Sequence, residues 1–217
     1  MEFNYIADGI DALVIDNFYT EEELNEIFKE LSWVTKPSIF VDERGLSTAE
    51  MGETIIASKK GIFLDGIISY WRYSALMKYP LLKMNESSFK ETLLSKNSLF
   101  KLFYGCNKRT HLLSYYENND YYGSHIDATV FTILNWFYKE PKQFTGGEII
   151  LRSETTNKIA EIECKNNRVV LMAGNTPHEV KPIISNLNDS YSGYGRYCNA
   201  IFLNIADSKE SRESLIK

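Results

Sequence analysis

The chain has 217 residues, of which 44% are hydrophobic and 13% aromatic, and its formal net charge is -5 at pH 7. This length and composition predict one compact domain with a substantial core. The negative charge disfavours nonspecific binding to a nucleic-acid backbone, which requires a concentrated basic surface. Nucleic acid is therefore not expected as a partner.

The composition also indicates where the protein resides. No run of apolar residues is long enough to span a membrane, and the acidic Glu2 stands where a signal peptide would carry positive charge. The cysteines, Cys106, Cys164 and Cys198, are an odd number without close spacing, which indicates neither a disulfide framework nor a C-x-x-C zinc site. We expect a cytoplasmic protein with reduced thiols and no membrane partner, and the oligomeric state is left open.

The first part of the chain has mainly helical patterns. Thr20 and Glu23 form a capping box at the start of a stretch with apolar residues at helical spacing, which predicts an amphipathic helix. Residues 36–60 lack periodicity and contain several turn-forming residues, so we expect a long loop with short strands that serves a site. Helical spacing returns between residues 63 and 104. Residues 1–104 are thus predicted to be a helical support region that packs on a β-domain.

From residue 105 the pattern changes to short runs rich in Tyr, Ile, Val, Phe and Thr, separated by Asn, Gly, Lys and Pro. Examples are THLLSYY, TVFTILNWFY, GGEIILRS, NRVVLMAGN and RYCNAIFLNI. Each run has the length of a strand and ends at a turn signal. Residues 105–207 are therefore predicted to form a β-sandwich or jelly roll of about eight strands, and residues 208–217 a charged tail. The predicted fold class is mainly β with N-terminal helices (α+β).

A candidate metal site lies in this second half. His125 and Asp127 are two residues apart in the stretch YYGSHIDATVF, and residues two apart in a strand share a face and can bind the same ion. His178 follows the predicted strand NRVVLMAG after a turn, at the mouth of the same β-domain. Two histidines and one carboxylate form the facial triad that suits non-haem Fe(II) with open coordination positions. Zinc is more often closed by four protein ligands or by three histidines.

The order of motifs across residues 105–205 extends this interpretation. Reading forward, the motifs are Tyr115, Tyr122, the H-x-D pair, TGGEIIL, NRVVLM, PHEVKPI and GRYCNAIFL. This order resembles the prolyl 4-hydroxylase-like branch of the Fe(II)- and 2-oxoglutarate-dependent dioxygenases. The resemblance implies a distorted double-stranded β-helix buttressed by helices, with Fe(II) ligation by His125, Asp127 and His178.

The resemblance also implies a basic residue on a late strand that binds the distal carboxylate of 2-oxoglutarate, and Arg196 occupies that position. A guanidinium offers two parallel donors to a carboxylate. On a strand that starts at Arg196, Cys198 and Ala200 share its face, and these small side chains leave room for a ligand. Lys181 and Arg168 are the alternative basic residues.

Three aromatic residues complete the implied site. Tyr115 lies ten residues before His125, where the family places a tyrosine whose hydroxyl helps to hold the cosubstrate. Trp136 is expected to face the same pocket from the next strand, and Tyr122 to line the substrate side. The alternative for each is packing within a strand. The inserted stretch SNLNDSYSGYG, within residues 184–195, suits a lid or a loop that contacts the substrate.

The implied activity is hydroxylation of a C–H bond with Fe(II), 2-oxoglutarate and O2, and ascorbate is a candidate reductant. Because Asp127 fills the carboxylate position, iron has no spare site for a halide, and hydroxylation is favoured over halogenation. The substrate implied by this branch is a prolyl residue in a peptide or protein. Two alternatives stay open: the same chemistry on a free amino acid, small metabolite or nucleobase, and a non-catalytic metal-binding β-domain.

Overall fold

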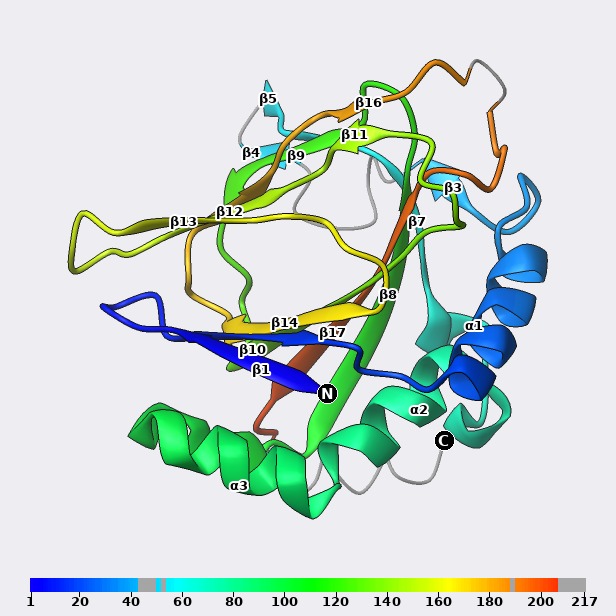
Figure 1. Ribbon diagram of the computed structural model, residues 1–217. Coiled ribbons are helices and arrows are strands. Elements are labelled where there is room, and N and C mark those ends of the chain that lie inside the picture. The colour runs from blue at the N-terminus through cyan, green and yellow to red at the C-terminus, as the bar shows by residue number, and fades with distance from the viewer. Residues whose placement is uncertain (43–49, 52–53, 188–189, 207–217) are drawn as a thin grey trace.

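A computed structural model of the chain describes residues 1–42, 50–51, 54–187 and 190–206. Two antiparallel β-sheets face each other at its centre, and helices cover the other side of the larger sheet (Figure 1). This architecture confirms the predicted fold class, a mainly β jelly roll buttressed by helices. It also creates an interior between the sheets in which a site can form.

Within the described residues, the larger sheet has eight strands and the smaller sheet five. In spatial order, the larger sheet comprises β1 (Glu2–Ile6), β2 (Ala12–Asp16), β14 (Arg168–Ala173), β10 (Phe131–Phe137), β17 (Arg196–Asn204), β8 (Lys108–Tyr116), β7 (Lys60–Phe63) and β3 (Val41–Asp42). The smaller sheet, in the upper part of Figure 1, comprises β13 (Ile159–Ile162), β12 (Ile149–Arg152), β15 (His178–Val180), β9 (Tyr121–His125) and β6 (Ala57–Ser58). Two short ladders pair β11 (Thr145–Gly146) with β16 (Ile183–Ile184), and β4 (Glu50–Met51) with β5 (Thr54–Ile55).

The helices precede the long strands. They are α1 (Glu21–Val34), α2 (Ala75–Met84) and α3 (Ser87–Lys96), with 3₁₀ helices at Leu64–Gly66, Trp71–Tyr73 and Ser98–Gly105. Helix α1 begins at the predicted capping box, in which Thr20 Oγ1 accepts from the Glu23 N–H and the Glu23 carboxylate accepts from the Thr20 N–H. The buried Glu30 carboxylate links α1 to α2, since it accepts from the Ser74 hydroxyl at 2.6 Å and from the Leu76 N–H at 3.0 Å. In the described part of the chain, no helix is both long and apolar enough to cross a membrane.

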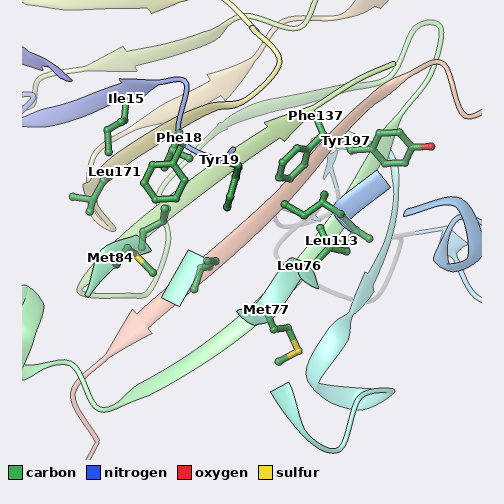
Figure 2. Packing of buried hydrophobic residues seen from close by; sticks show 14 of the residues in the cluster. Ile15, Phe18, Tyr19, Leu76, Met77, Met84, Leu113, Phe137, Leu171 and Tyr197 are labelled. Atoms are coloured by element: carbon green, nitrogen blue, oxygen red, sulfur yellow. The ribbon is translucent and has the colours of Figure 1, made fainter. Parts of the chain in front are cut away.

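The central strands of the larger sheet are buried on both faces. Along β8, Leu113 and Tyr115 belong to the core on the helix side, whereas Leu112 and Tyr116 belong to the core between the sheets. Strands β10 and β17 alternate in the same way. Figure 2 shows the helix side, where side chains of α2 lie beside those of β8, β10 and β17. A residue of the larger sheet can therefore reach the interior between the sheets only from one of its two faces.

The N-terminal region differs from the predicted helical support region over residues 1–104. Strands β1 and β2 extend one edge of the larger sheet, β7 and β3 extend the other, and β6 joins the smaller sheet beside β9. These N-terminal strands have two to five residues, too few to produce a clear alternating pattern. The boundary expected at residue 105 therefore does not separate helices from strands. The expected tail, residues 208–217, lies outside the described residues.

His111 is a buried titratable residue on the helix side of β8. The residue is fully buried, and neither ring nitrogen has a hydrogen-bond partner within the residues that the structure describes. Burial lowers the pKa of its imidazole to about 3, and the charge of Arg109 acts in the same direction. The ring is therefore neutral in the folded protein, whereas an unfolded histidine binds a proton below a pH of about 6.5. The folded state consequently loses stability as the pH falls from the unfolded pKa toward about 3.

From His111 alone, we expect the free energy of unfolding of the ligand-free protein to fall by up to about 1.4 kcal/mol per pH unit in this range. Glutamine at position 111 binds no proton, so His111→Gln should remove this contribution, up to about 1.4 kcal/mol per pH unit, from the slope of unfolding free energy against pH. Urea unfolding at several pH values between about 7.5 and about 5 measures both slopes. The comparison with the parent cancels the contributions of other groups, and equal slopes in the two proteins would contradict the assignment.

Candidate active site

The three residues predicted as metal ligands come together where β9 and β15 pair. His125 ends β9, His178 begins β15, and the two are register partners in the smaller sheet. The carboxylate oxygens of Asp127 lie 3.8 Å from His125 Nε2 and 3.7 Å from His178 Nε2. Donors that each lie about 2.1 Å from one ion are at most about 4.2 Å apart. Both distances therefore suit three ligands of a single metal ion.

Hydrogen bonds outside this cluster orient its donor atoms. His125 Nδ1 lies 2.8 Å from the Gly123 carbonyl, and His178 Nδ1 lies 2.8 Å from the Thr176 carbonyl. Because a carbonyl only accepts, each Nδ1 carries the proton and each Nε2 presents a lone pair to the cluster. Burial, followed by the neighbouring His178, lowers the pKa of His125 to about 4. That ring is therefore ready to bind a metal at neutral pH.

The carboxylate of Asp127 is held in the same way. The Thr132 hydroxyl donates to Asp127 Oδ2 at 2.6 Å, and the Asp127 N–H donates to the Gly174 carbonyl at 2.8 Å. Such outer partners fix the orientation of metal ligands and influence metal affinity. Hydrogen bonds within the protein therefore orient all three side chains of the cluster.

The cluster forms one wall of a pocket between the two sheets. The other lining residues are Lys59, Leu112, Ser114, Tyr116, Tyr122, Leu134, Val180, Arg196, Cys198, Ala200 and Phe202. They come from both sheets and from the short segment between β6 and β7. Cys198 and Ala200 share the pocket face with Arg196, as the alternation along β17 predicted.

Arg196 is a fully buried cation in this pocket. Its guanidinium carbon lies 4.8 Å from the Tyr116 ring centroid and 5.1 Å from the Trp136 ring centroid. Among the described residues, none of its three guanidinium nitrogens has a hydrogen-bond partner. Gly147, at φ +74°, passes so close that an added Cβ would lie 3.1 Å from the Arg196 Cδ. A buried guanidinium without a partner indicates a bound anion as its missing acceptor.

The alternative basic residues lie elsewhere. Arg168 makes two hydrogen bonds to the Asp16 carboxylate, at 2.5 Å and 2.7 Å. Lys181 pairs with Glu161 at 2.8 Å on the surface. Neither of them lines the pocket. Among the three basic residues considered from the sequence, the structure brings only Arg196 beside the metal cluster.

Two of the three predicted aromatic residues lie at the site. Tyr122 lines the pocket, and its ring stacks on that of His125 with centroids 3.7 Å apart and an angle of 17°. Trp136 does not line the cavity, but its buried ring supports the Arg196 guanidinium from the larger sheet. Tyr122 therefore contacts His125 of the cluster directly, whereas Trp136 contacts Arg196.

Tyr115 is placed differently from the prediction. It lies on the helix side of β8, so its hydroxyl cannot hold a cosubstrate in the pocket, and the neighbouring Tyr116 lines the pocket instead. The Tyr115 hydroxyl accepts from the Gly193 N–H at 2.9 Å and from the Gly195 N–H at 3.1 Å. Tyr115 thus anchors the inserted segment where it enters β17. Residues 188–189 of that insertion lie outside the described residues, as do 43–49 and 52–53 of the other predicted loop.

Replacing Tyr115 with phenylalanine should destabilise the protein by about 1–3 kcal/mol, because two backbone N–H groups lose their acceptor. It should also weaken 2-oxoglutarate binding, since these groups precede Arg196. Fe(II) affinity should not change, because Tyr115 lies on the helix side of β8 and the proposed metal ligands line the pocket on the other side. Urea unfolding together with calorimetric titration measures these effects. Unchanged stability would contradict the anchoring role.

Lys59 is a pocket residue that the sequence analysis did not identify. It is 5% exposed, and its Nζ lies 3.4 Å from Ser114 Oγ and 4.2 Å from the Tyr122 ring centroid. It falls in the region predicted as a long loop, without a motif that indicates a site. The adjacent Lys59 and Lys60 at the start of the strand KGIF are the signal that could have suggested one inward-facing cation.

Comparisons with known proteins agree with this geometry. Residues 110–203 match the family model of the 2OG-Fe(II) oxygenase superfamily. A PKHD-type hydroxylase of Pseudoalteromonas atlantica is 28% identical over 158 residues, which are 64% of this chain and 69% of that protein. A prolyl-4-hydroxylase structure from Pseudomonas putida matches with a TM-score of 0.62 at 15% identity, covering 90% of this chain and 93% of that chain. A Trichoplax adhaerens prolyl hydroxylase, solved with a peptide fragment of hypoxia inducible factor, matches with a TM-score of 0.62 at 22% identity, covering 94% and 86%.

A jelly roll whose pocket holds two histidines and one aspartate defines the class of non-haem Fe(II) oxygenases. The family-model match over residues 110–203 and the His-Asp-His cluster both support a 2-oxoglutarate-dependent dioxygenase, the family expected from the motif order. Its cofactor is Fe(II), and its cosubstrates are 2-oxoglutarate and O2. A non-catalytic metal-binding β-domain is therefore not supported.

Proposed function

We propose that this enzyme hydroxylates a prolyl residue of a peptide or protein. In this proposal His125, Asp127 and His178 hold Fe(II), and Arg196 holds a carboxylate of 2-oxoglutarate. The observation that carries the proposal is the meeting, in one pocket, of the His-Asp-His cluster with a buried guanidinium that has no hydrogen-bond partner in the described part of the chain. The roles of the individual residues are tested by the variants described below.

The residues fit both groups chemically. Nitrogen and oxygen donors from two histidines and one carboxylate suit Fe(II), and three protein ligands leave positions for other ligands. Arg196 offers parallel N–H donors with the geometry of a carboxylate. The rings of Tyr116 and Trp136 flank this guanidinium and keep it away from water. The pocket therefore has a metal-binding wall and a separate carboxylate-binding residue.

When bound, Fe(II) and 2-oxoglutarate supply the oxidising chemistry, in which one oxygen atom of O2 enters the substrate C–H bond and the other enters succinate as CO2 is released. The chain supplies orientation and a dry environment. Arg196 orients the cosubstrate, and Thr132 holds Asp127 in place. The apolar side chains of Leu134, Val180 and Ala200 exclude water from the pocket.

Support for a prolyl substrate comes from the relatives and from an aromatic ring in the pocket. The Trichoplax adhaerens enzyme was solved with a peptide, and the two similar structures named above are prolyl hydroxylases. In this chain, the Tyr122 ring lines the pocket and offers apolar surface on which a proline ring can pack.

The test is incubation with Fe(II), 2-oxoglutarate, ascorbate and a series of proline-containing peptides, followed by mass spectrometry. We expect a gain of one oxygen atom on proline, with one succinate formed per hydroxylation. Free amino acids and nucleotides are assayed in parallel. Oxygen gain confined to those small molecules would contradict a prolyl substrate. If no succinate formed with any of these peptides, amino acids or nucleotides, other protein substrates would be tested next.

A further inference from the structure

An ion pair lies beside the segment that leads into Arg196. Lys60 of β7 binds the Glu117 carboxylate at 2.6 Å, and the two side chains are only 21% and 14% exposed. Glu117 directly follows β8, and Tyr116, the last residue of that strand, is the register partner of Arg196. The ion pair therefore belongs to the end of β8 at which β17 begins.

The same carboxylate holds the chain just before β17. Glu117 Oε1 accepts from the Ser192 N–H at 3.3 Å, and Glu117 Oε2 accepts from the Ser190 hydroxyl at 3.2 Å. The Lys60 ammonium lies 5.3 Å from the ring centroid of Tyr191. Glu117 and Lys60 thus contact three consecutive residues of the segment that leads into β17.

The backbone at the centre of these contacts has an unfavourable conformation. Tyr191 has φ +60°, in the left-handed region that residues other than glycine rarely adopt. Such a conformation costs about 1–3 kcal/mol and persists only where the surrounding structure enforces it. Glu117 contacts the residues on both sides, Ser190 and Ser192, and so supplies that constraint. Without Glu117, we expect the backbone of residues 190–192 to relax.

A shift of this segment would reach the guanidinium proposed to bind 2-oxoglutarate. Arg196 is the first residue of β17. The preceding Gly195 packs so tightly on β8 that an added Cβ would lie 2.1 Å from the Tyr116 carbonyl oxygen. The guanidinium itself lies between the rings of Tyr116 and Trp136. Because a guanidinium binds a carboxylate through two parallel donors, a small change in its direction weakens binding.

We infer that Glu117 is a positioning residue for the cosubstrate, an inference that rests on the role proposed for Arg196. Glu117 fixes residues 190–192, and these residues fix the start of the strand from which the Arg196 guanidinium enters the pocket. Glu117 is not among the described residues that line the pocket, so it acts through Arg196 and not by direct contact. Tyr115 anchors Gly193 and Gly195 in the same segment, and Glu117 anchors the residues before them.

The test is calorimetric titration of Fe(II)-loaded protein with 2-oxoglutarate in the absence of O2. Glu117→Ala should raise the dissociation constant for 2-oxoglutarate about tenfold, whereas anaerobic titration should show parent-like Fe(II) affinity. Glu117→Gln should keep most of the 2-oxoglutarate affinity, because its amide oxygen can still accept from the Ser192 N–H. Asp16→Ala is the matched control, since it removes a carboxylate from the ion pair with Arg168 at another place in the larger sheet. It should lower stability in urea and leave 2-oxoglutarate affinity unchanged.

Combination with Arg196→Met shows whether Glu117 acts through the arginine. Glu117→Ala should weaken 2-oxoglutarate binding about tenfold in the parent but less than about twofold in Arg196→Met, because the effects of two residues on one interaction are not additive. A general loosening of the fold would weaken binding equally in both proteins. Equal weakening in both, or parent-like affinity in Glu117→Ala, would overturn the inference.

These results separate the inference from the proposed function. If Arg196→Met weakened 2-oxoglutarate binding and Glu117→Ala did not, the role of Arg196 would stand and the role of Glu117 would be wrong. If neither variant changed the affinity, the role proposed for Arg196 would itself be wrong. None of these titrations contains a peptide, so the prolyl assignment is tested independently of them.

Discussion

Replacing His178 with alanine is expected to lower Fe(II) affinity by more than about 100-fold and to abolish hydroxylation. Loss of a residue that only orients a metal ligand already costs about 10- to 100-fold in affinity, and His178 is proposed as a ligand itself. The strand pairing of β15 with β9 and β12 uses backbone groups, so the fold should persist. Anaerobic Fe(II) titration, with circular dichroism as a check of folding, measures this result.

The neighbouring residue provides a matched control. Glu179 lies on the same strand as His178, but its side chain faces the other way and binds Arg152 at 2.5 Å. Glu179→Gln should therefore leave Fe(II) affinity unchanged. If His178→Ala retained the iron occupancy of the parent, His178 would not be a ligand, and the assignment of the cluster would be wrong.

Replacing Arg196 with methionine is expected to weaken 2-oxoglutarate binding by about 30-fold or more, because losing one partner of a buried charge pair costs about 2–5 kcal/mol. The same change should not lower the stability of the ligand-free protein. Its guanidinium is buried, and no described residue hydrogen-bonds to it, so its removal relieves a desolvation cost. Calorimetric titration with 2-oxoglutarate and urea unfolding without it measure the two effects.

Two further variants complete this experiment. Arg196→Lys should restore part of the affinity, since lysine supplies the charge without the paired donors. Arg168→Met should show the opposite pattern, with lower stability because its ion pair with Asp16 is lost and with unchanged 2-oxoglutarate affinity. If Arg196→Met kept the 2-oxoglutarate affinity of the parent, the role would pass to Lys59, the other cation among the described residues that line the pocket.

Much of the fold and the central part of the site could be predicted from local patterns. The capping box at Thr20 predicted the start of α1 because its two hydrogen bonds join residues only three positions apart. The long strands β8, β10 and β17 were predicted because each contains enough apolar residues to show its period. His125 and Asp127 were recognised because a spacing of two residues places both side chains on one side of the chain.

The tertiary structure decided which side chains enter the pocket. Tyr115 and Tyr116 are adjacent and equally suited to a strand. The sequence therefore could not show which of the two faces the pocket and which faces the helices. Pairing of β8 with β17 and β7, far away in the sequence, sets the register, and the helices cover the face that carries Tyr115. A shift of one residue would exchange all the side chains between the two faces.

The same long-range pairing decided the remaining parts of the site. Lys59 enters the pocket because the short strands on either side of it join two different sheets, β6 with β9 and β7 with β8. Neither strand is long enough to reveal its alternation. The sequence by itself determined the jelly-roll class, the metal-binding residue types and Arg196, because these depend on local spacing and motif order. The second cation and the correct tyrosine depended on contacts between distant segments, because only those contacts define the inside of the pocket.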